Sequence, residues 1–180
     1  MEIKQLIIEA KAGDTRAFGQ VYNEYLTPIY RYIYFRVGDK SLADDLTQEV
    51  FLKIFVSLDN LKISENSPLT YFYTVARNLL IDNYRKKKIP TMDDEEAENR
   101  LVEISNPENQ AITIENSDRL SEALQEIPEN EADVLVLKFI DDYPNREISK
   151  IMGKSEEAIR QLQSRGLKSL RKIISQKDFI

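Results

Sequence analysis

Apolar residues recur every three or four positions along most of the chain, and this spacing predicts amphipathic helices rather than strands. The first predicted helix covers residues 3–10, and a second begins at Asp14 or Thr15. Thr27 and Pro28 predict the start of a third, because Thr is a favoured cap and Pro a favoured first residue of a helix. The N-terminal part of the chain is therefore expected to be a group of helices.

Two longer helices are predicted between residues 41 and 88. Ser41 caps the first, whose inward positions are Leu42, Leu46, Val50, Ile54 and Phe55. The second covers residues 68–88 and turns inward Phe72, Val75, Ala76, Leu79, Leu80 and Tyr84. Aromatic and basic side chains remain on its outer side, where rings can stack on bases and cations can neutralise phosphates of single-stranded nucleic acid. Core packing explains aromatic residues equally well, so both interpretations stay open.

The most informative stretch is residues 145–171, which predict a short helix, a tight turn and a longer helix. Asn145 is expected to cap the first helix, Gly153 to supply the left-handed backbone of the turn, and Ser155 to cap the second helix. This is the outline of a helix-turn-helix. The outer side of the second helix carries residues suited to base edges and phosphates, namely Arg160, Gln161, Ser164, Arg165 and Lys168. A solvated surface helix is the alternative interpretation of these residues.

Composition excludes several kinds of chemistry. The chain contains no cysteine and no histidine, so disulfides, Cys/His zinc sites and histidine acid–base catalysis are excluded. Asp44 and Asp45 are neighbouring carboxylates, but successive helical residues point apart and no second ligand cluster accompanies them. We therefore expect that the chain has no catalytic site and binds no metal or cofactor. We also expect that it is not an enzyme.

No apolar run approaches the roughly 18–20 residues that a membrane span needs. The first residues also lack the basic start of a signal peptide. We expect no membrane insertion and a cytoplasmic location.

The net charge of −6 is concentrated in the middle of the chain. Residues 1–88 carry a net charge of +2, residues 89–118 carry −8, and residues 119–180 carry none. The middle segment holds the acidic run 93–98, two prolines and no sustained helical pattern, so it is predicted to be a flexible acidic linker. The predicted fold is all-α, with two small helical domains, 1–88 and 119–180, joined by this linker. A linker of like charges is either a solvated tether or a segment that repels nucleic acid.

Three signals occur in one order along the chain. They are residues 45–52 (Asp-Leu-Thr-Gln-Glu-Val-Phe-Leu), residues 71–78 (Tyr-Phe-Tyr-Thr-Val-Ala-Arg-Asn) with the basic end that follows, and the helix-turn-helix. Their order, spacing and size resemble a bacterial sigma factor of the extracytoplasmic-function (ECF) group. The resemblance covers nearly the whole chain and is more specific than any one of the three signals.

The resemblance implies three binding surfaces. The core-polymerase surface, which in the family meets the β′ clamp helices, corresponds to Asp45, Gln48, Glu49 and Phe51. The segment that opens and reads the −10 element as single-stranded DNA corresponds to Tyr71, Tyr73, Arg77, Asn78, Asp82, Arg85, Lys86 and Lys87. The helix that reads the −35 element in duplex DNA corresponds to Arg160, Gln161, Ser164, Arg165 and Lys168. The helices before the turn correspond to those that meet the β flap, and an anti-sigma factor is implied as a further partner.

Two positions depart from the family pattern. Tyr71 stands where tryptophan is common, which keeps a ring with a polar tip. Leu162 and Gln163 stand where the family has a basic residue followed by an apolar one, so the −35 preference is not inherited.

Two alternatives of another class remain. A helix-turn-helix repressor or activator that works without polymerase shares residues 145–171, but it gives no reason for the pattern at 45–52. A module that binds only protein partners would not bind DNA even with polymerase present.

Overall fold

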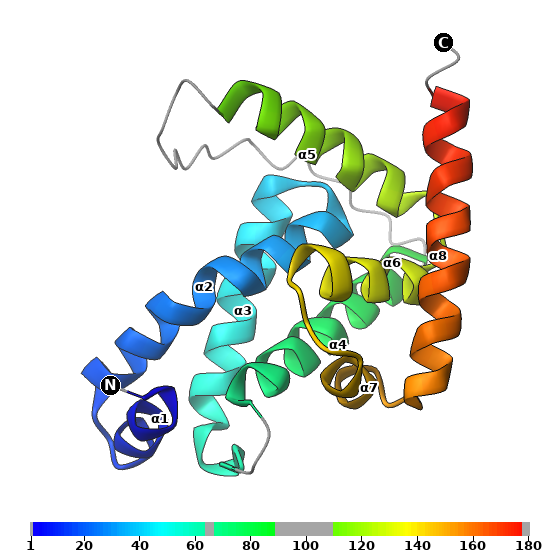
Figure 1. Ribbon diagram of the computed structural model, residues 1–180. Helices are drawn as coiled ribbons and strands as arrows, with labels where there is room; N and C mark the ends of the chain where they lie inside the picture. Colours follow the sequence, from blue (N-terminus) through cyan, green and yellow to red (C-terminus); the bar gives the residue numbers. More distant parts are fainter. Residues whose placement is uncertain (1, 64–66, 89–109, 178–180) are drawn as a thin grey trace.

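The computed structural model describes residues 2–63, 67–88 and 110–177, and every regular element in these ranges is a helix. The N-terminal helices are α1 (Ile3–Lys11), α2 (Thr15–Val37), α3 (Lys40–Val56) and α4 (Pro68–Lys88), with a short 3-10 turn, η1 (Leu58–Asn60). The C-terminal helices are α5 (Gln110–Gln125), α6 (Glu129–Leu135), α7 (Asn145–Met152) and α8 (Glu156–Lys177), with a π-helical turn, η2 (Val136–Ile140). The predicted all-α fold is confirmed (Figure 1).

The N-terminal helices form a bundle around α2, which packs against α1, α3 and α4. Its apolar side is buried against them, with Ile29 and Ile33 fully enclosed. Aromatic rings join the layers, since Tyr22 lies on Phe51 of α3 with ring centroids 4.6 Å apart. Burial of these large side chains is the main stabilising contribution to the bundle.

The prediction that Thr27 and Pro28 begin a new helix is wrong. One helix, α2, runs through both residues and ends at Gly38, which adopts the left-handed conformation at φ 71°. Proline inside a helix loses a backbone hydrogen bond and costs about 3 kcal/mol. Packing of α2 on four neighbouring helices, α1, α3, α4 and α5, outweighs this local cost.

Of two other predicted helix starts, the one at Asp14 is confirmed and the one at Ser41 is wrong. Asp14 caps α2, because its Oδ1 accepts the backbone N–H of Arg16 at 2.9 Å. Ser41 does not cap α3, because the helix begins at Lys40 and Asp39 accepts the N–H of Leu42 at 2.8 Å. A cap two residues earlier adds two residues to the helix, and the negative charge of the carboxylate interacts favourably with the positive N-terminal end of the helix dipole.

Part of the segment expected as the acidic linker is helical. The helix α5 begins at Gln110, whereas residues 89–109, which include the acidic run 93–98, lie outside the described residues. Contacts with α2 hold α5 in place: the Tyr34 hydroxyl donates to Asp118, and Ser121 Oγ donates to the Tyr34 carbonyl at 3.3 Å. These contacts come from distant parts of the chain, so a local hydrophobic pattern does not predict them.

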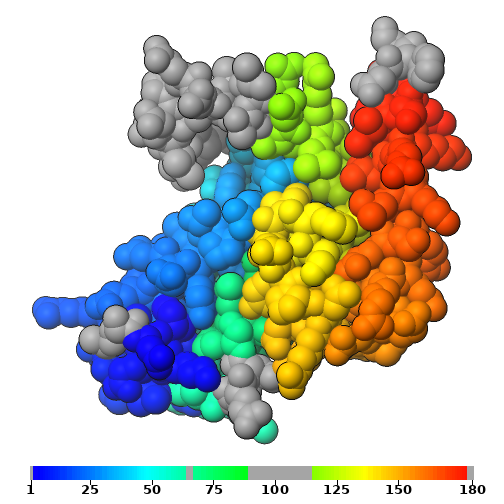
Figure 2. Space-filling view, viewed as in Figure 1, coloured from blue at the N-terminus to red at the C-terminus, as the bar shows by residue number. Residues whose placement is uncertain are grey.

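The C-terminal helices lie directly on the N-terminal helices, α5 against α2 and α7 against α4. Figure 2 shows the surface of residues 125–155 seated against the surface of the N-terminal helices. Thr70 of α4 donates to Glu147 of α7 at 2.7 Å. The ring of Tyr73 meets Tyr143, which precedes α7, with centroids 5.1 Å apart. The two groups of helices therefore share an interface of polar and aromatic contacts.

A buried ion cluster lies in the middle of this interface. The Asp133 carboxylate of α6 lies 2.6 Å from Arg36 Nε of α2 and 3.1 Å from Arg77 Nε of α4. The hydroxyl of Tyr32 donates to the same carboxylate at 3.0 Å. Burial alone lowers the pKa of Arg36, but the Asp133 carboxylate raises it above its usual value, so the guanidinium stays charged.

The left-handed end of α2 gives a test of the backbone assignment. Gly38→Ala should lower the free energy of unfolding by at least about 1–2 kcal/mol, because an added Cβ disfavours positive φ and also meets the side chain of Gln125. Gly19→Ala is the matched control inside the same helix, where an added Cβ meets no atom within 4 Å. It should raise the free energy of unfolding by up to about 1 kcal/mol. Urea denaturation measures both, and effects of the same sign would contradict the assignment.

Candidate nucleic-acid interface

The helices α7 and α8 form the predicted helix-turn-helix. Gly153 ends α7 in the left-handed conformation at φ 62°, as predicted. Ser155 Oγ accepts the backbone N–H of Ala158 at 3.1 Å, so its predicted role as the cap of α8 is confirmed. Ile148 and Ile159 are fully buried between the helices, which fixes the angle at which α8 leaves the turn.

A hydrogen bond across the turn joins the two helices. Gln163 Nε2 donates to Asn145 Oδ1 at 2.7 Å. Asn145 is the first residue of α7 and follows Pro144, so the prediction that it caps this helix is wrong. The role of Gln163 was not predicted from the sequence. Its spacing of four residues after the buried Ile159 is the signal that would have placed it against α7.

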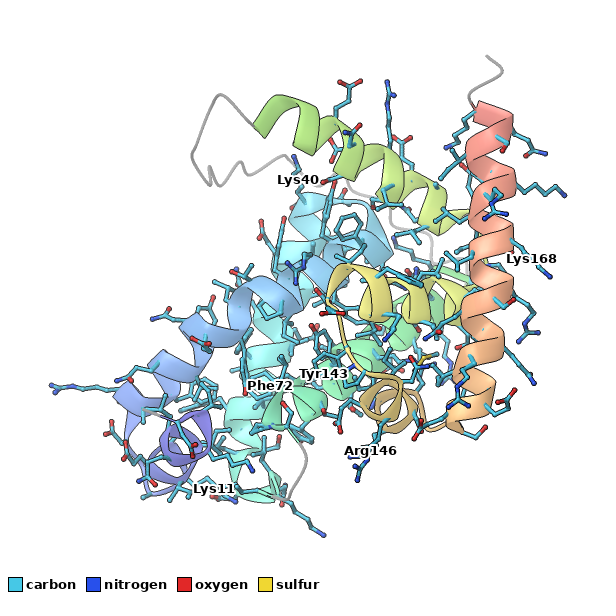
Figure 3. The ribbon with its side chains drawn as sticks, viewed as in Figure 1. Lys11, Lys40, Phe72, Tyr143, Arg146 and Lys168 are labelled. Atoms are coloured by element: carbon cyan, nitrogen blue, oxygen red, sulfur yellow. The ribbon has the colours of Figure 1, made fainter. Side chains whose placement is uncertain are left out.

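The outer face of α8 is open to solvent. Its exposed residues are Arg160, Gln161, Ser164, Arg165 and Lys168, the five predicted for the −35 element. Arg160 pairs with Glu157 at 3.1 Å, which holds it along the helix surface. Arg165 and Lys168 make no hydrogen bond or ion pair within the described ranges. Figure 3 shows Lys168 pointing away from the rest of the molecule. This α8 face is free to contact a ligand.

The residues of α4 that were predicted for the −10 element fall into an exposed group and a covered group. Exposed side chains at and beyond its middle are Asn78, Asp82, Arg85, Lys86 and Lys87. Tyr71 is half-buried, and its hydroxyl lies 3.4 Å from Ser57 Oγ. Tyr73 is 1% exposed beneath Tyr143. In this arrangement Tyr73 is not available to stack on a base.

Arg77 lies where the two parts of this α4 surface meet. Its Nε is paired with Asp133, and its Nη2 donates to Asn130 Oδ1 at 3.0 Å. A cavity of about 230 Å³ opens beside it. The charged lining residues are Arg36, Arg77, Arg85, Lys88, Glu129 and Asp133. Cations exceed carboxylates there, so the cavity favours anions.

The predicted core-polymerase surface lies on α3. Asp45, Gln48 and Glu49 are exposed on its outer side. Phe51, in contrast, is 3% exposed and packs on Tyr22 and Phe72, so it supports the helix from inside and is not part of its surface. This corrects the prediction for Phe51.

Apolar residues extend the exposed face of α3. Leu52 and Val56 are 62% and 79% exposed, and both follow Glu49 at helical spacing. Phe55, predicted to point inward, is 45% exposed, although its ring touches Phe18 at 4.9 Å. Positions 45, 49, 52 and 56 fall on one side of a helix, and this spacing is the signal that could have revealed the face.

Among the described residues, no group of three or more carboxylates is arranged to hold a metal ion. In the same ranges, no helix is long and apolar enough to cross a membrane.

Two protein-family models match the chain. Sigma-70 region 2 matches residues 21–89, which contain most of α2 and all of α3 and α4. Sigma-70, region 4 matches residues 123–172, which contain the helix-turn-helix. The matched regions carry the exposed α3 face, the α4 surface and the α8 face.

Relatives match along the length of the chain. The ECF RNA polymerase sigma factor SigW of Bacillus subtilis is 31% identical over 181 residues, which cover 96% of this chain and 96% of SigW. The sigma factor BldN of Streptomyces coelicolor is 30% identical over 172 residues. That match covers 94% of this chain but 65% of BldN, so the chain spans about two thirds of that relative's length.

A solved structure shares the fold. The sigma factor RpoE in complex with the anti-sigma factor NepR from Bartonella quintana gives a TM-score of 0.66 at 15% identity, covering 89% of this chain and 98% of that one. At this identity the likeness concerns the fold alone. The family models and the relatives together show that the chain belongs to the ECF group of RNA polymerase sigma factors.

Proposed function

We propose that this chain binds core RNA polymerase, directs it to promoters that carry −10 and −35 elements, and promotes opening of the DNA. The observation that carries the proposal is the open α8 face within the matched Sigma-70 region 4, on a chain that also matches region 2. Promoter opening requires a protein that binds unstacked bases better than paired ones, and no catalytic side chain. The proposed role is therefore not that of an enzyme.

The α8 face is proposed to read the −35 element. Arginine and glutamine make bidentate contacts to guanine and adenine edges in the major groove. Arg165 and Gln161 supply these groups, and Lys168 supplies a cation for the phosphate backbone. The bond from Gln163 to Asn145 holds α8 at a fixed angle to α7, which supports a defined docking geometry.

The α4 surface is proposed to bind the −10 element as a single strand. The residues assigned to this role are Tyr71, Tyr73, Arg77, Asn78, Asp82, Arg85, Lys86 and Lys87. The exposed basic end can hold phosphates while the chain is closed. Tyr73 and Arg77 reach DNA only after the C-terminal helices have moved away.

The exposed face of α3 is proposed to bind the β′ clamp helices of core polymerase, through Asp45, Gln48 and Glu49. The apolar neighbours Leu52 and Val56 support this proposal, because exposed apolar side chains on one helix face are typical of a protein-binding surface. The C-terminal helices are proposed to meet the β flap. Core polymerase and promoter DNA place the complex in the cytoplasm.

An anti-sigma factor is a further proposed partner. The related fold of RpoE is found in complex with the anti-sigma factor NepR, which supports an inhibitor of the same kind for this chain. A polymerase-independent repressor accounts only for the helix-turn-helix and leaves the region 2 match without a role.

The proposed function predicts the outcome of run-off transcription. Core polymerase with this protein, on fragments of its own genome, should give discrete transcripts that start a fixed distance downstream of a shared two-part motif. Core polymerase alone is the control. Absence of new transcripts, together with duplex binding that needs no polymerase, would favour the repressor instead.

The α8 face predicts graded effects of substitution. Arg165→Ala should weaken promoter binding by the polymerase complex by about 1–3 kcal/mol if the side chain contacts a guanine. If it contacts only a phosphate, the slope of log affinity against log salt should fall by about one. Lys177→Ala is the matched control, since this cation of the same helix is paired with Glu126 at 2.7 Å. Fluorescence anisotropy over a salt series measures both, and equal losses would remove Arg165 from the interface.

The α3 face predicts a loss of polymerase binding. The double variant Gln48→Ala with Glu49→Ala should impair association with core polymerase, because it removes two polar contacts while the buried side of α3 is unchanged. Gln5→Ala with Glu9→Ala is the control, because it removes the same two kinds of side chain from the exposed side of α1. Co-purification with core polymerase measures association, and circular dichroism verifies helicity. Undiminished association of the α3 variant would argue against this surface.

A further inference from the structure

The chain contains an internal anion at the surface proposed for the −10 element. Arg77 is one of the residues proposed to bind this strand, and in the structure its guanidinium is bonded to the carboxylate of Asp133. The same carboxylate holds Arg36, whose side chain is 3% exposed. A carboxylate and a phosphate are both oxyanions that pair with arginine. Asp133 therefore occupies a position on Arg77 that a DNA phosphate would need.

A second contact covers the neighbouring aromatic residue. The ring of Tyr143 lies across Tyr73, and Glu147 accepts the hydroxyl of Thr70 at 2.7 Å. Burial and the nearby Asp141 carboxylate raise the pKa of Tyr73, so its phenol remains protonated. The C-terminal helices thus withhold both a ring that could stack on a base and a cation that could bind a phosphate.

The two proposed DNA surfaces differ in their exposure to solvent. All five predicted residues of the α8 face are exposed, and Lys168 among them points away from the rest of the molecule (Figure 3). Tyr73 and Arg77, by contrast, lie in the interface. The contact between the two groups of helices covers Tyr73 and Arg77 of one DNA surface and leaves the other surface open.

We propose that Asp133 is an autoinhibitory residue: its carboxylate competes with DNA phosphates for Arg77 and holds the chain closed, with Tyr73 and Arg77 of the single-strand surface covered and the α8 face free. This inference rests on the proposed function, because it concerns the regulation of the −10 surface. The partner that displaces Asp133 is a polyanionic single strand.

The cavity beside Arg77 supplies a route for this displacement. It is open to solvent and lined by Arg85 and Lys88, which are exposed. A phosphate held by these two cations lies next to the pair formed by Arg77 and Asp133. Once Arg77 turns to the phosphate, Asp133 keeps only Arg36 and Tyr32 as partners. Removal of the carboxylate charge should therefore favour the open chain and the binding of single-stranded DNA.

The test uses the full chain without polymerase. Asp133→Asn removes the charge and keeps the shape of the side chain. Glu131→Gln is the matched control, because this residue is buried on the same helix and bonds Ser169 of α8, within the C-terminal helices. The probes are a short fluorescein-labelled single strand of mixed sequence and a labelled duplex of mixed sequence. Small-angle X-ray scattering gives the radius of gyration of each variant.

The expected result for Asp133→Asn is single-strand binding about fivefold tighter or more than that of the original chain, a smaller change for the duplex, and a larger radius of gyration. Glu131→Gln should resemble the original chain in all three measurements. Equal single-strand affinities of Asp133→Asn and Glu131→Gln would overturn the proposal, whether or not the radius of gyration rises.

A second variant guards against loss of folding. Tyr143→Ala removes the ring over Tyr73 and leaves the buried ion cluster intact, and it should also tighten single-strand binding. If Asp133→Asn does not fold, unchanged binding by Tyr143→Ala overturns the proposal. Run-off transcription by the original chain separates the two levels. If transcripts appear but neither variant binds the single strand more tightly, only autoinhibition is contradicted. If no transcripts appear, the proposed function itself is contradicted.

Discussion

The contact on which the closed arrangement depends is the carboxylate of Asp133 between two arginines. Removing charges from water is costly, and the cost is recovered only when every partner is present with good geometry. Here Arg36, Arg77 and Tyr32 meet one carboxylate, and three helices are tied together at a single point. Loss of one partner from such a buried pair destabilises by about 3–5 kcal/mol, because a charge is left without compensation. The closed chain is therefore most stable when Asp133 has all three partners, and a new partner for Arg77 weakens the contact between the helices.

The helix-turn-helix was predictable because its determinants are local. Gly153 and Ser155 act on neighbouring backbone groups, and the inward stripe of α8 follows from helical spacing alone. The wrong prediction at Pro28 has its cause in tertiary packing. Pro28 was taken as a helix start because its cost is local, whereas the contacts that outweigh it come from four other helices. The fold class was accessible from sequence, and several helix boundaries were not.

The candidate site could be predicted only in part from the sequence, again because of tertiary packing. Phe72 belongs to the predicted inward stripe of α4 and Tyr73 was expected outside it, yet both are buried. The helix α4 is enclosed on two sides, by the N-terminal bundle and by α7, and no periodicity reveals the second side. The role of Asp133 could not be predicted either, because a carboxylate between acidic and apolar residues of α6 is ordinarily solvated. Its partners lie far away in the chain and come together only in the fold.

The closed chain leaves the α3 face exposed, since α3 packs chiefly on α2 and α4 and not on the C-terminal helices. Docking to core polymerase and opening of the chain are consequently separable events. A partner shifts an equilibrium only by the difference between its affinities for the two states. A clamp that contacts α3 alone has no such preference, because that face is the same in both states. Opening must therefore be driven by contacts that the closed chain cannot make, on the C-terminal helices, on the covered part of α4, or by the DNA strand itself.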